Sequence, residues 1–396
     1  MQGGPRSSIG RAVGTFLLAL ALLLPGTARA VSITVSGPEQ VIFQHSTMAC
    51  ESADYADAPM RAFRDSLGRV QIVMSHIVHR RMIGPDFDNL THPCDVMTYS
   101  AHNADPAASN DNLWITGIYT QNGRDVFALA HNEYHGQWHQ PGPCPSNDFQ
   151  SCHWNTVMLI TSANNGDTYN NGPPNPVVAS MPIPYLPDGG RYGFFGTSNI
   201  VTKDGYFYTM LLTTPGMGLQ RNGVCVARTR DIADPGSWRA WDGASFSARF
   251  VNPYRESVEP LKSHVCEPVS NSNILEMNRS LTWNTVLNKW VLTGTSGKFD
   301  PSQSRTVWGF YYSVSDDLIH WSSRQLLMET ETFQTYQCGD PDPLHYPSLI
   351  DPDSPDRNFS TADGTAQLYF TRIHMNAMCQ LNPDRDLVRV PIQISP

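Results

Sequence analysis

One local plan recurs five times between residue 60 and the C-terminus. Each copy has a short apolar strand, a turn rich in Gly, Asn or Asp, and a second strand that ends in polar or aromatic residues. The first strands are 61–63, 114–119, 198–201, 281–283 and 346–350, and the second strands are 70–76, 126–131, 206–212, 290–294 and 368–374. A strand-built repeat with a period of roughly 70 residues is typical of a β-propeller blade. The sequence therefore predicts an all-β fold, a five-bladed β-propeller.

The two ends of the chain carry further strand patterns. Residues 31–43 alternate loosely between apolar and polar side chains before the first copy, and residues 387–394 do so after the last one. A propeller is often closed by pairing an N-terminal strand with C-terminal strands, because this removes an exposed sheet edge. We predict that these segments pair. Since no Ser/Gly-rich or Pro-rich linker separates the copies, we also predict that residues 31–396 form a single domain.

The first thirty residues have the features of an export signal. Arg6 and Arg11 precede an apolar run over 16–24, and Ala28-Arg29-Ala30 fits the small-x-small cleavage rule. We predict that residues 1–30 are a signal peptide cleaved after Ala30, and that the mature protein is secreted or periplasmic. The apolar run is too short to span a bilayer, so no stable membrane insertion is expected.

Cysteine count and charge narrow the possible partners. All eight cysteines follow the predicted signal peptide, and an even count in an exported protein predicts disulfides, although their pairing stays open. No paired C-x-x-C signature is present, so we predict no zinc site and no cofactor, and leave only a structural calcium ion open. The net charge of −9 comes without a basic run, which argues against nucleic acid. We expect a monomer.

Three outer turns resemble those of known propellers. Ser162-x-Asn164-x-Gly166-x-Thr168-Tyr169 resembles the Asp-box turn of sialidases, with Asn for Asp and Tyr for Trp. Segment 315–321, Ser-Asp-Asp-Leu-Ile-His-Trp, closely resembles the outer hairpin of five-bladed glycosidases of families 43 and 32, and segment 230–238 loosely resembles it. We interpret these turns as structural, because a short Asp or Asn bonds turn amides while the Trp packs between sheets. The resemblance implies a central pocket where carboxylates near inner-strand starts act on glycosyl groups.

The strongest candidate for such a carboxylate stands at the start of the first copy. In the glycosidases that this chain resembles, an Asp next to a Pro opens the first inner strand as base or nucleophile, and Asp57 with Pro59 is similar at one residue looser spacing. A strand period of two would place Asp57 and Arg61 on one face. We expect Arg61 to keep Asp57 ionised and to clamp the substrate.

A second candidate group lies at the end of the second copy. If residues 126–135 stay extended, His131, Glu133 and His135 share one face. We predict that Glu133 is the general acid and that the histidines tune its pKa. A satisfied polar network is the alternative. A metal site is disfavoured, because the order is not His-Glu-x-x-His and that motif needs a helix.

The remaining site predictions come from aligning the copies. Counting back from the turn of the fourth copy places Glu276 near the axis as a third carboxylate. Asn199, at the entry of the third inner strand, is the predicted partner for a sugar hydroxyl, and Arg372, in the last strand of the fifth copy, is the predicted second clamp. We expect His76, His131 and Tyr346 to line the pocket. The three-acid order of family 43 is not reproduced, because residues 192–203 contain no carboxylate.

These features lead to one functional prediction and two alternatives. We predict a secreted glycosidase-like hydrolase that acts on a carbohydrate with paired carboxylates. The missing family acids favour a non-catalytic carbohydrate-binding or surface-interaction propeller instead. Arg61, Arg279 and Arg372 lie near the ends of different inner strands, and three converging guanidiniums would suit a sialidase-like enzyme acting on acidic sugars.

Overall fold

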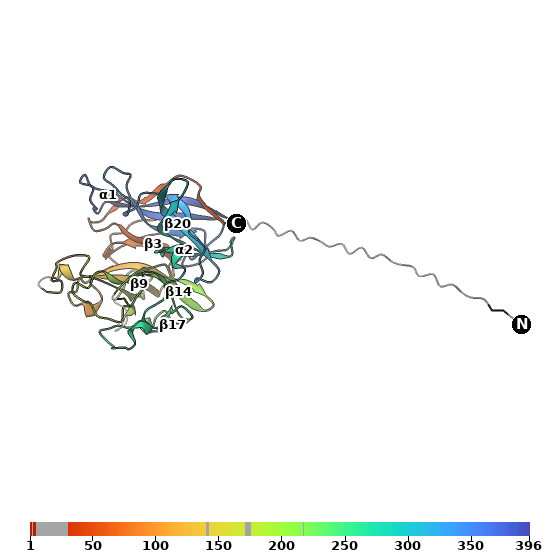
Figure 1. The fold of residues 1–396 in the computed structure, drawn as a ribbon. Coiled ribbons are helices and arrows are strands. Elements are labelled where there is room, and N and C mark those ends of the chain that lie inside the picture. The colour runs from red at the N-terminus through yellow and green to blue at the C-terminus, as the bar shows by residue number, and fades with distance from the viewer. Residues whose placement is uncertain (2, 5–30, 140–141, 171–175, 217) are drawn as a thin grey trace. The chain divides into compact units, whose positions relative to one another are not determined.

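A computed structural model describes residues 1, 3–4, 31–139, 142–170, 176–216 and 218–396. The predicted signal peptide lies outside the described residues apart from positions 1, 3 and 4. Residues 31–396 form one unit, built from strands with only short helical turns (Figure 1), which confirms the predicted all-β class. The helical turns are α1 (His45–Met48), α2 (Asn271–Ile274) and the 3-10 turns Pro106–Ala108, Gly136–Trp138, Pro235–Ser237 and Leu261–His264.

Each predicted copy folds as an antiparallel pair that begins its own group of strands. The five inner strands and their partners are β3 (Ala56–Arg64) with β4 (Val70–Ser75), β8 (Asn112–Thr120) with β9 (Val126–His135), β12 (Tyr192–Thr197) and β13 (Val201–Lys203) with β14 (Tyr206–Thr214), β18 (Ser280–Asn284) with β19 (Lys289–Asp300), and β22 (Leu344–Ile350) with β24 (Thr365–Ile373). The turn signals in the sequence thus locate all five hairpins.

Outer strands extend these five groups. The third strands are β6 (Arg81–Gly84), β10 (His153–Ser162), β15 (Gly223–Thr229), β20 (Arg305–Ser315) and β25 (Arg385–Ser395). The other strands are β5 (Val78–His79), β7 (Thr98–Tyr99), β11 (Val177–Ala179), β16 (Arg239–Trp241), β17 (Phe246–Ala248), β21 (Gln325–Glu329) and β23 (Thr361–Ala362). The second and third groups join where β10 runs parallel to β12. Gly193 allows the two strands to approach closely at this junction, because its φ is +115° and a Cβ there would lie 2.1 Å from the Asn155 carbonyl oxygen.

The two ends of the 31–396 unit meet in the fifth group. β1 (Ser32–Val35) pairs antiparallel with β25, so that Ser32 faces Ser395. β2 (Gln40–Phe43) pairs with the same strand, so that Val41 faces Val388. The predicted pairing of the terminal segments is therefore confirmed.

Five apolar clusters fill the spaces between consecutive groups. They join β3 and β4 to β8 and β9, β9 and β10 to β12 and β15, β14 and β15 to β18 and β19, β19 and β20 to β22 and β24, and β22 and β24 back to β3 and β4. The period of two along a strand supplies both sides of a sheet: Met210 of β14 packs in one cluster and Leu211 in the next. Both faces of these sheets are buried, which explains why the strands read as nearly continuous apolar runs.

Arg61 of β3 ties the inner strands together, and this corrects its predicted role. Its guanidinium donates to the carbonyl oxygens of Thr116, Thr197 and Arg279 and to the Ser348 hydroxyl. It is 2% exposed. Inner strands are sheet edges with unpaired carbonyls, which must be satisfied when they are buried. Because the donors of Arg61 are used in this way, it does not pair with Asp57 and is not the expected substrate clamp.

The outer turns and disulfides stabilise the periphery. Asp317 Oδ1 accepts the amides of Ile319 and His320, and Trp321 is buried, as the structural interpretation of these turns predicts. The eight cysteines pair as chain neighbours, 50–94, 144–152, 225–266 and 338–379, which is consistent with an extracellular or periplasmic protein. Within the described residues, no helix is both long and apolar enough to cross a membrane.

Candidate functional site

A small cavity lies where inner strands of several groups begin. Its volume is about 180 Å³, and its wall includes Asp57, Trp114, His131, Glu133, Arg279 and Tyr346, with Phe195 beside them. We call it the central cavity. The structure thus brings together two predicted carboxylates, one predicted histidine and the predicted tyrosine from β3, β9 and β22, while β8 contributes Trp114.

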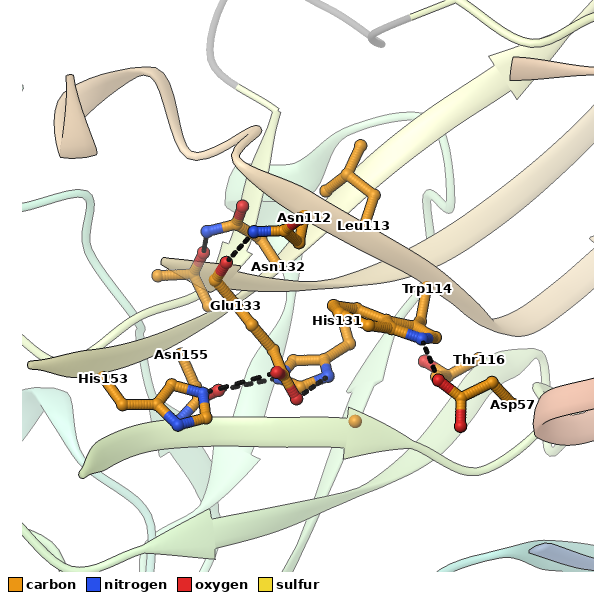
Figure 2. Close-up of polar contacts among 12 residues, drawn as sticks. Asp57, Asn112, Leu113, Trp114, Thr116, His131, Asn132, Glu133, His153 and Asn155 are labelled. Atoms are coloured by element: carbon orange, nitrogen blue, oxygen red, sulfur yellow. Dashed lines mark hydrogen bonds and ion pairs between the residues drawn. The ribbon is translucent and has the colours of Figure 1, made fainter. Parts of the chain in front are cut away.

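Asp57 is the most heavily bonded carboxylate of the central cavity. Its Oδ2 accepts a hydrogen bond from the Trp114 indole at 3.0 Å (Figure 2), and its Oδ1 accepts one from the Tyr346 hydroxyl at 3.2 Å. Arg385 forms an ion pair with Oδ1, and His76 Nε2 lies 3.6 Å from Oδ2. Burial disfavours the charged form of Arg385, but Asp57, together with the nearby Tyr346 and Tyr55, outweighs this and raises the pKa of Arg385. The counter-ion of Asp57 is therefore Arg385, and not Arg61.

Tyr346 reaches Asp57 from an unusual backbone conformation. It lies at a bulge in β22, between the paired residues His345 and Ser348, and its φ is +58°. The left-handed region is costly for an aromatic residue, by about 1–3 kcal/mol, and such strain is concentrated at functional sites. Burial and the nearby charge of Asp57 raise the pKa of Tyr346, so its hydroxyl stays protonated.

Glu133 stands among three histidines on the other side of the central cavity. Figure 2 shows its carboxylate directed between His131 and His153. His131 Nδ1 lies 3.7 Å from Oε1, while His135 Nε2 and His153 Nε2 lie 3.0 Å and 3.5 Å from Oε2. The prediction that His131, Glu133 and His135 share one face of an extended strand is confirmed.

The protonation states of this group run opposite to the general-acid prediction. Burial alone would raise the pKa of Glu133, but the hydrogen bond from His135 and the fields of His153 and His131 hold it well below its usual value. Burial lowers the pKa of His131 to about 4 and that of His153 to about 3. At neutral pH the site therefore holds an ionised Glu133 beside the neutral imidazoles of His131 and His153. A general acid needs the reverse, a carboxyl group with a raised pKa.

Arg279 separates the central cavity from a larger one. The second cavity has a volume of about 390 Å³ and is lined by Glu276, Arg279, Trp308 and His345 among others. The Arg279 guanidinium stacks 5.5 Å from the Tyr346 ring centre, and in the described part of the chain no acceptor is hydrogen-bonded to it. Its donors are thus open to a ligand in either cavity.

Three other predicted site residues lie away from the central cavity. Glu276 is exposed, accepts a hydrogen bond from Asn222 at 2.8 Å and lines only the second cavity. The Asn199 side-chain amide donates to the Leu281 carbonyl oxygen and accepts from the Leu281 amide, both at 2.7 Å. Arg372 forms an ion pair with Glu39 at a separate surface cavity. Of the three arginines in the sialidase-like alternative, only Arg279 lines the central cavity.

Several residues of the site carry no signal in the sequence. Trp114, Phe195 and Arg385 were not predicted as site residues, and neither was His153, which pairs directly across from His135. Their positions follow from strand register and from contacts between groups far apart in the chain. The polar end of β9 marked His131, Glu133 and His135 in the sequence, but no signal marked these four residues.

No protein-family model matches this sequence, and no curated protein matches it. Among solved structures, a GH43_1 enzyme from Xanthomonas citri is similar at 10% identity, with 89% of each chain covered and a TM-score of 0.47. An alpha-L-arabinofuranosidase from Fusarium graminearum is similar at 10% identity over 90% of this chain and 98% of that one, with a TM-score of 0.44.

A xylan beta-1,4-xylosidase from Bacillus halodurans is similar at 10% identity over 86% of this chain but only 54% of that one, with a TM-score of 0.44. A family 43 enzyme is thus among the solved structures that this chain is similar to, whereas a resemblance to sialidases is not shown. Because the TM-scores are below 0.5, substrate and mechanism have to come from this chain's own residues.

Proposed function

We propose that residues 31–396 form a closed five-bladed β-propeller. Three observations support this architecture: five antiparallel groups, five apolar clusters between consecutive groups including the last and the first, and one arginine bonded to several inner strands. A ring leaves the inner strand edges facing a common axis. The central cavity would then lie on that axis.

We propose that the protein is an exported, monomeric, glycosidase-like hydrolase that binds its carbohydrate substrate in the central cavity. The observation that carries this proposal is the presence of two carboxylates, Asp57 and Glu133, in one cavity with the aromatic rings of Trp114 and Phe195. Glycosidases use carboxylate pairs, and aromatic faces suit the apolar faces of sugar rings. The volume of about 180 Å³ is below the roughly 300–1,000 Å³ of drug-sized sites, so it suits a single sugar ring.

In this proposal Asp57 is the base or nucleophile. An ionised carboxylate offers about four acceptor positions, and Tyr346, Trp114 and Arg385 occupy three of them. The remaining position would receive a water molecule or a sugar hydroxyl. Arg279 would hold the next part of the substrate at the passage to the second cavity, whose exposed Glu276 can accept from further hydroxyls.

Glu133 is the second carboxylate and the proposed proton donor. To donate a proton, Glu133 must be protonated when the substrate is bound. The substrate would have to displace the histidine contacts that lower the pKa of Glu133. The same lowered pKa favours a second candidate function, a non-catalytic carbohydrate-binding propeller that uses Glu133 as a fixed hydrogen-bond acceptor.

A glycan panel separates the two functions. The mature protein should hydrolyse at least one oligosaccharide, and Asp57→Asn should reduce turnover by about 10²–10⁴-fold while sugar binding persists. Glu133→Gln should do the same if Glu133 donates the proton. Asp316→Asn is the matched control, because Asp316 is an exposed partner of Lys289 on an outer turn.

Each outcome decides between the assignments. Binding without hydrolysis by the parent protein supports the binding propeller. Unchanged hydrolysis by Asp57→Asn refutes the role of Asp57. Thermal unfolding of each variant guards against a folding defect, since removal of the Asp57 charge leaves Arg385 buried and unpaired.

A further inference from the structure

Three donor side chains converge on one face of the β9–β10 hairpin. Glu133 and His135 are two residues apart on β9, and His153 of β10 is the direct cross-strand partner of His135. Side chains in this arrangement point the same way and are neighbours. The group is not recognisable in the sequence, because its third member, His153, comes from a different strand.

The distances within this group suit a small ion. The ligand atoms of the three residues all lie within 4.8 Å of one another, and Glu133 Oε2 is 3.0 Å and 3.5 Å from the Nε2 atoms of His135 and His153. Donors bound tetrahedrally at 2.0–2.2 Å are separated by about 3.3 Å. The three donors therefore need only small shifts to share an ion.

Internal hydrogen bonding does not account for these histidines. Both are 1% exposed, and among the described residues His135 Nδ1 and both ring nitrogens of His153 have no hydrogen-bond partner. An unpaired buried polar group costs about 1–3 kcal/mol. The His153 Nε2 atom points at the Glu133 carboxylate without a geometrically sound hydrogen bond, which leaves its lone pair available.

Aromatic neighbours hold the two imidazoles in place. The His135 ring lies 4.0 Å from the Trp138 ring and 4.8 Å from that of Phe149, and Phe149 also contacts His153 at 5.1 Å between ring centres. Rings locked by packing form a preorganised donor set.

We propose that Glu133, His135 and His153 form a binding site for a divalent transition-metal ion, with zinc as the ion that fits best. Two imidazole nitrogens and one carboxylate oxygen match the donors of three-ligand zinc sites, which keep an open coordination position. Calcium is a poor fit, because it takes six to eight oxygen ligands. The prediction of no zinc site relied on cysteine spacing and on the helical His-Glu-x-x-His motif, and it missed a set assembled across a β-hairpin.

Metal content tests this site without reference to turnover. The purified protein is loaded with Zn²⁺, dialysed against metal-free buffer, and its zinc is measured by mass spectrometry, with affinity from a competition titration. We expect about one zinc per chain. His135→Gln and His153→Gln should each weaken zinc binding by at least about a hundredfold, because loss of an outer-shell partner alone costs about 10–100-fold.

His79→Gln is the matched control, since His79 is equally buried but bonds the Leu113 carbonyl outside the group. It should keep its zinc. A second measurement avoids the variants: zinc, but not calcium, should raise the melting temperature of the parent protein. Bound Co²⁺ should show the visible absorption of a low-coordinate site.

Loss of stoichiometric zinc from the parent protein, or full zinc retention by both histidine variants, would overturn the site. The zinc measurement does not depend on turnover, so its outcome can be distinguished from that of the glycan panel even though the two proposals give Glu133 different roles. Zinc binding without hydrolysis supports the site and counts against the enzyme, whereas hydrolysis without zinc binding does the opposite. If zinc occupies the group, Glu133 is a ligand and the proton donor lies elsewhere.

Discussion

Two arginines near the inner strands, Arg61 and Arg279, mark two regions that differ in what their polar groups do. Around Arg61, the guanidinium donates to three carbonyls and one hydroxyl from other strands, at distances up to 3.3 Å. Around Arg279, the guanidinium faces two cavities and stacks on Tyr346. The sequence predicted Arg61 as a substrate clamp and placed Arg279 only in the sialidase-like alternative, yet it is Arg279 whose side-chain donors carry no hydrogen bond among the described residues.

The contrast shows that the same type of residue can stabilise the fold at one position and be available to a ligand at another. Inner strands are sheet edges whose carbonyls need donors once they are buried. Arg61 meets that need in one region. In the other region, partly satisfied side chains and aromatic faces surround a space, which is the general character of a binding site.

Removal of the Arg61 guanidinium should have the largest effect. Arg61→Met should lower the free energy of unfolding by at least about 4 kcal/mol, because several buried acceptors lose their donor at about 1–3 kcal/mol each. Arg279→Met should change it by less than about 1 kcal/mol, since no described hydrogen bond is lost. Urea denaturation measures both, and similar losses in the two variants would remove the distinction between the regions.

His79, like Arg61, is a buried side chain that bonds a backbone carbonyl, and it makes the stability of the protein depend on pH. His79 Nε2 lies 2.9 Å from the Leu113 oxygen, and burial lowers the pKa of His79 to about 4 from the usual 6.5. The unfolded chain therefore binds the proton first as the pH falls. The stability contributed by neutral His79 is complete above pH 6.5 and is lost between about pH 6.5 and 4.

That loss amounts to about 3 kcal/mol at 1.36 kcal/mol per unit of pKa. His79→Gln keeps a donor for the Leu113 carbonyl and cannot titrate, so its unfolding free energy should fall less steeply over this pH range. Parallel profiles for the parent and the variant, measured by urea denaturation at each pH, would show that His79 does not titrate as described.

The smallest expected effect is on ligand affinity at Arg279. Arg279→Met should weaken sugar binding or raise KM by about 10–100-fold, or about 1.4–2.8 kcal/mol, with little change in stability. The sugar affinity of Arg279→Lys should lie between those of the parent protein and of Arg279→Met, because lysine keeps the charge but not the planar fork of donors. Calorimetric titration with the glycan identified in the panel provides the measurement, and an unaltered affinity in Arg279→Met would remove Arg279 from the site.

Much of the fold was predictable because its signals are local. Turn residues and alternating apolar strands located all five hairpins, and the strand patterns at 31–43 and 387–394 correctly indicated that these ends pair. The third copy was less regular than expected, since residues 198–200 lie between β12 and β13. Local patterns could not show the parallel junction of β10 with β12, because it depends on Gly193 meeting a distant strand.

The site was predictable only in part. Asp57, Glu133, His131 and Tyr346 do share one cavity, since strand starts and ends are where a strand-built repeat exposes polar side chains. The sequence could not tell that Arg61 bonds backbone carbonyls, that Asn199 bonds Leu281, or that Arg385 rather than Arg61 pairs with Asp57. These outcomes depend on which strands become neighbours.

The sequence by itself determined the strands, their hairpins and the polar positions along them, because each depends on residues close together in the chain. Tertiary structure alone decided which polar groups are satisfied and which remain open. Burial and distance set hydrogen bonding and charge, and both are fixed between residues such as Asp57 and Arg385 that are far apart in sequence. The chemistry of the site therefore belongs to the arrangement of the groups of strands and not to any one segment.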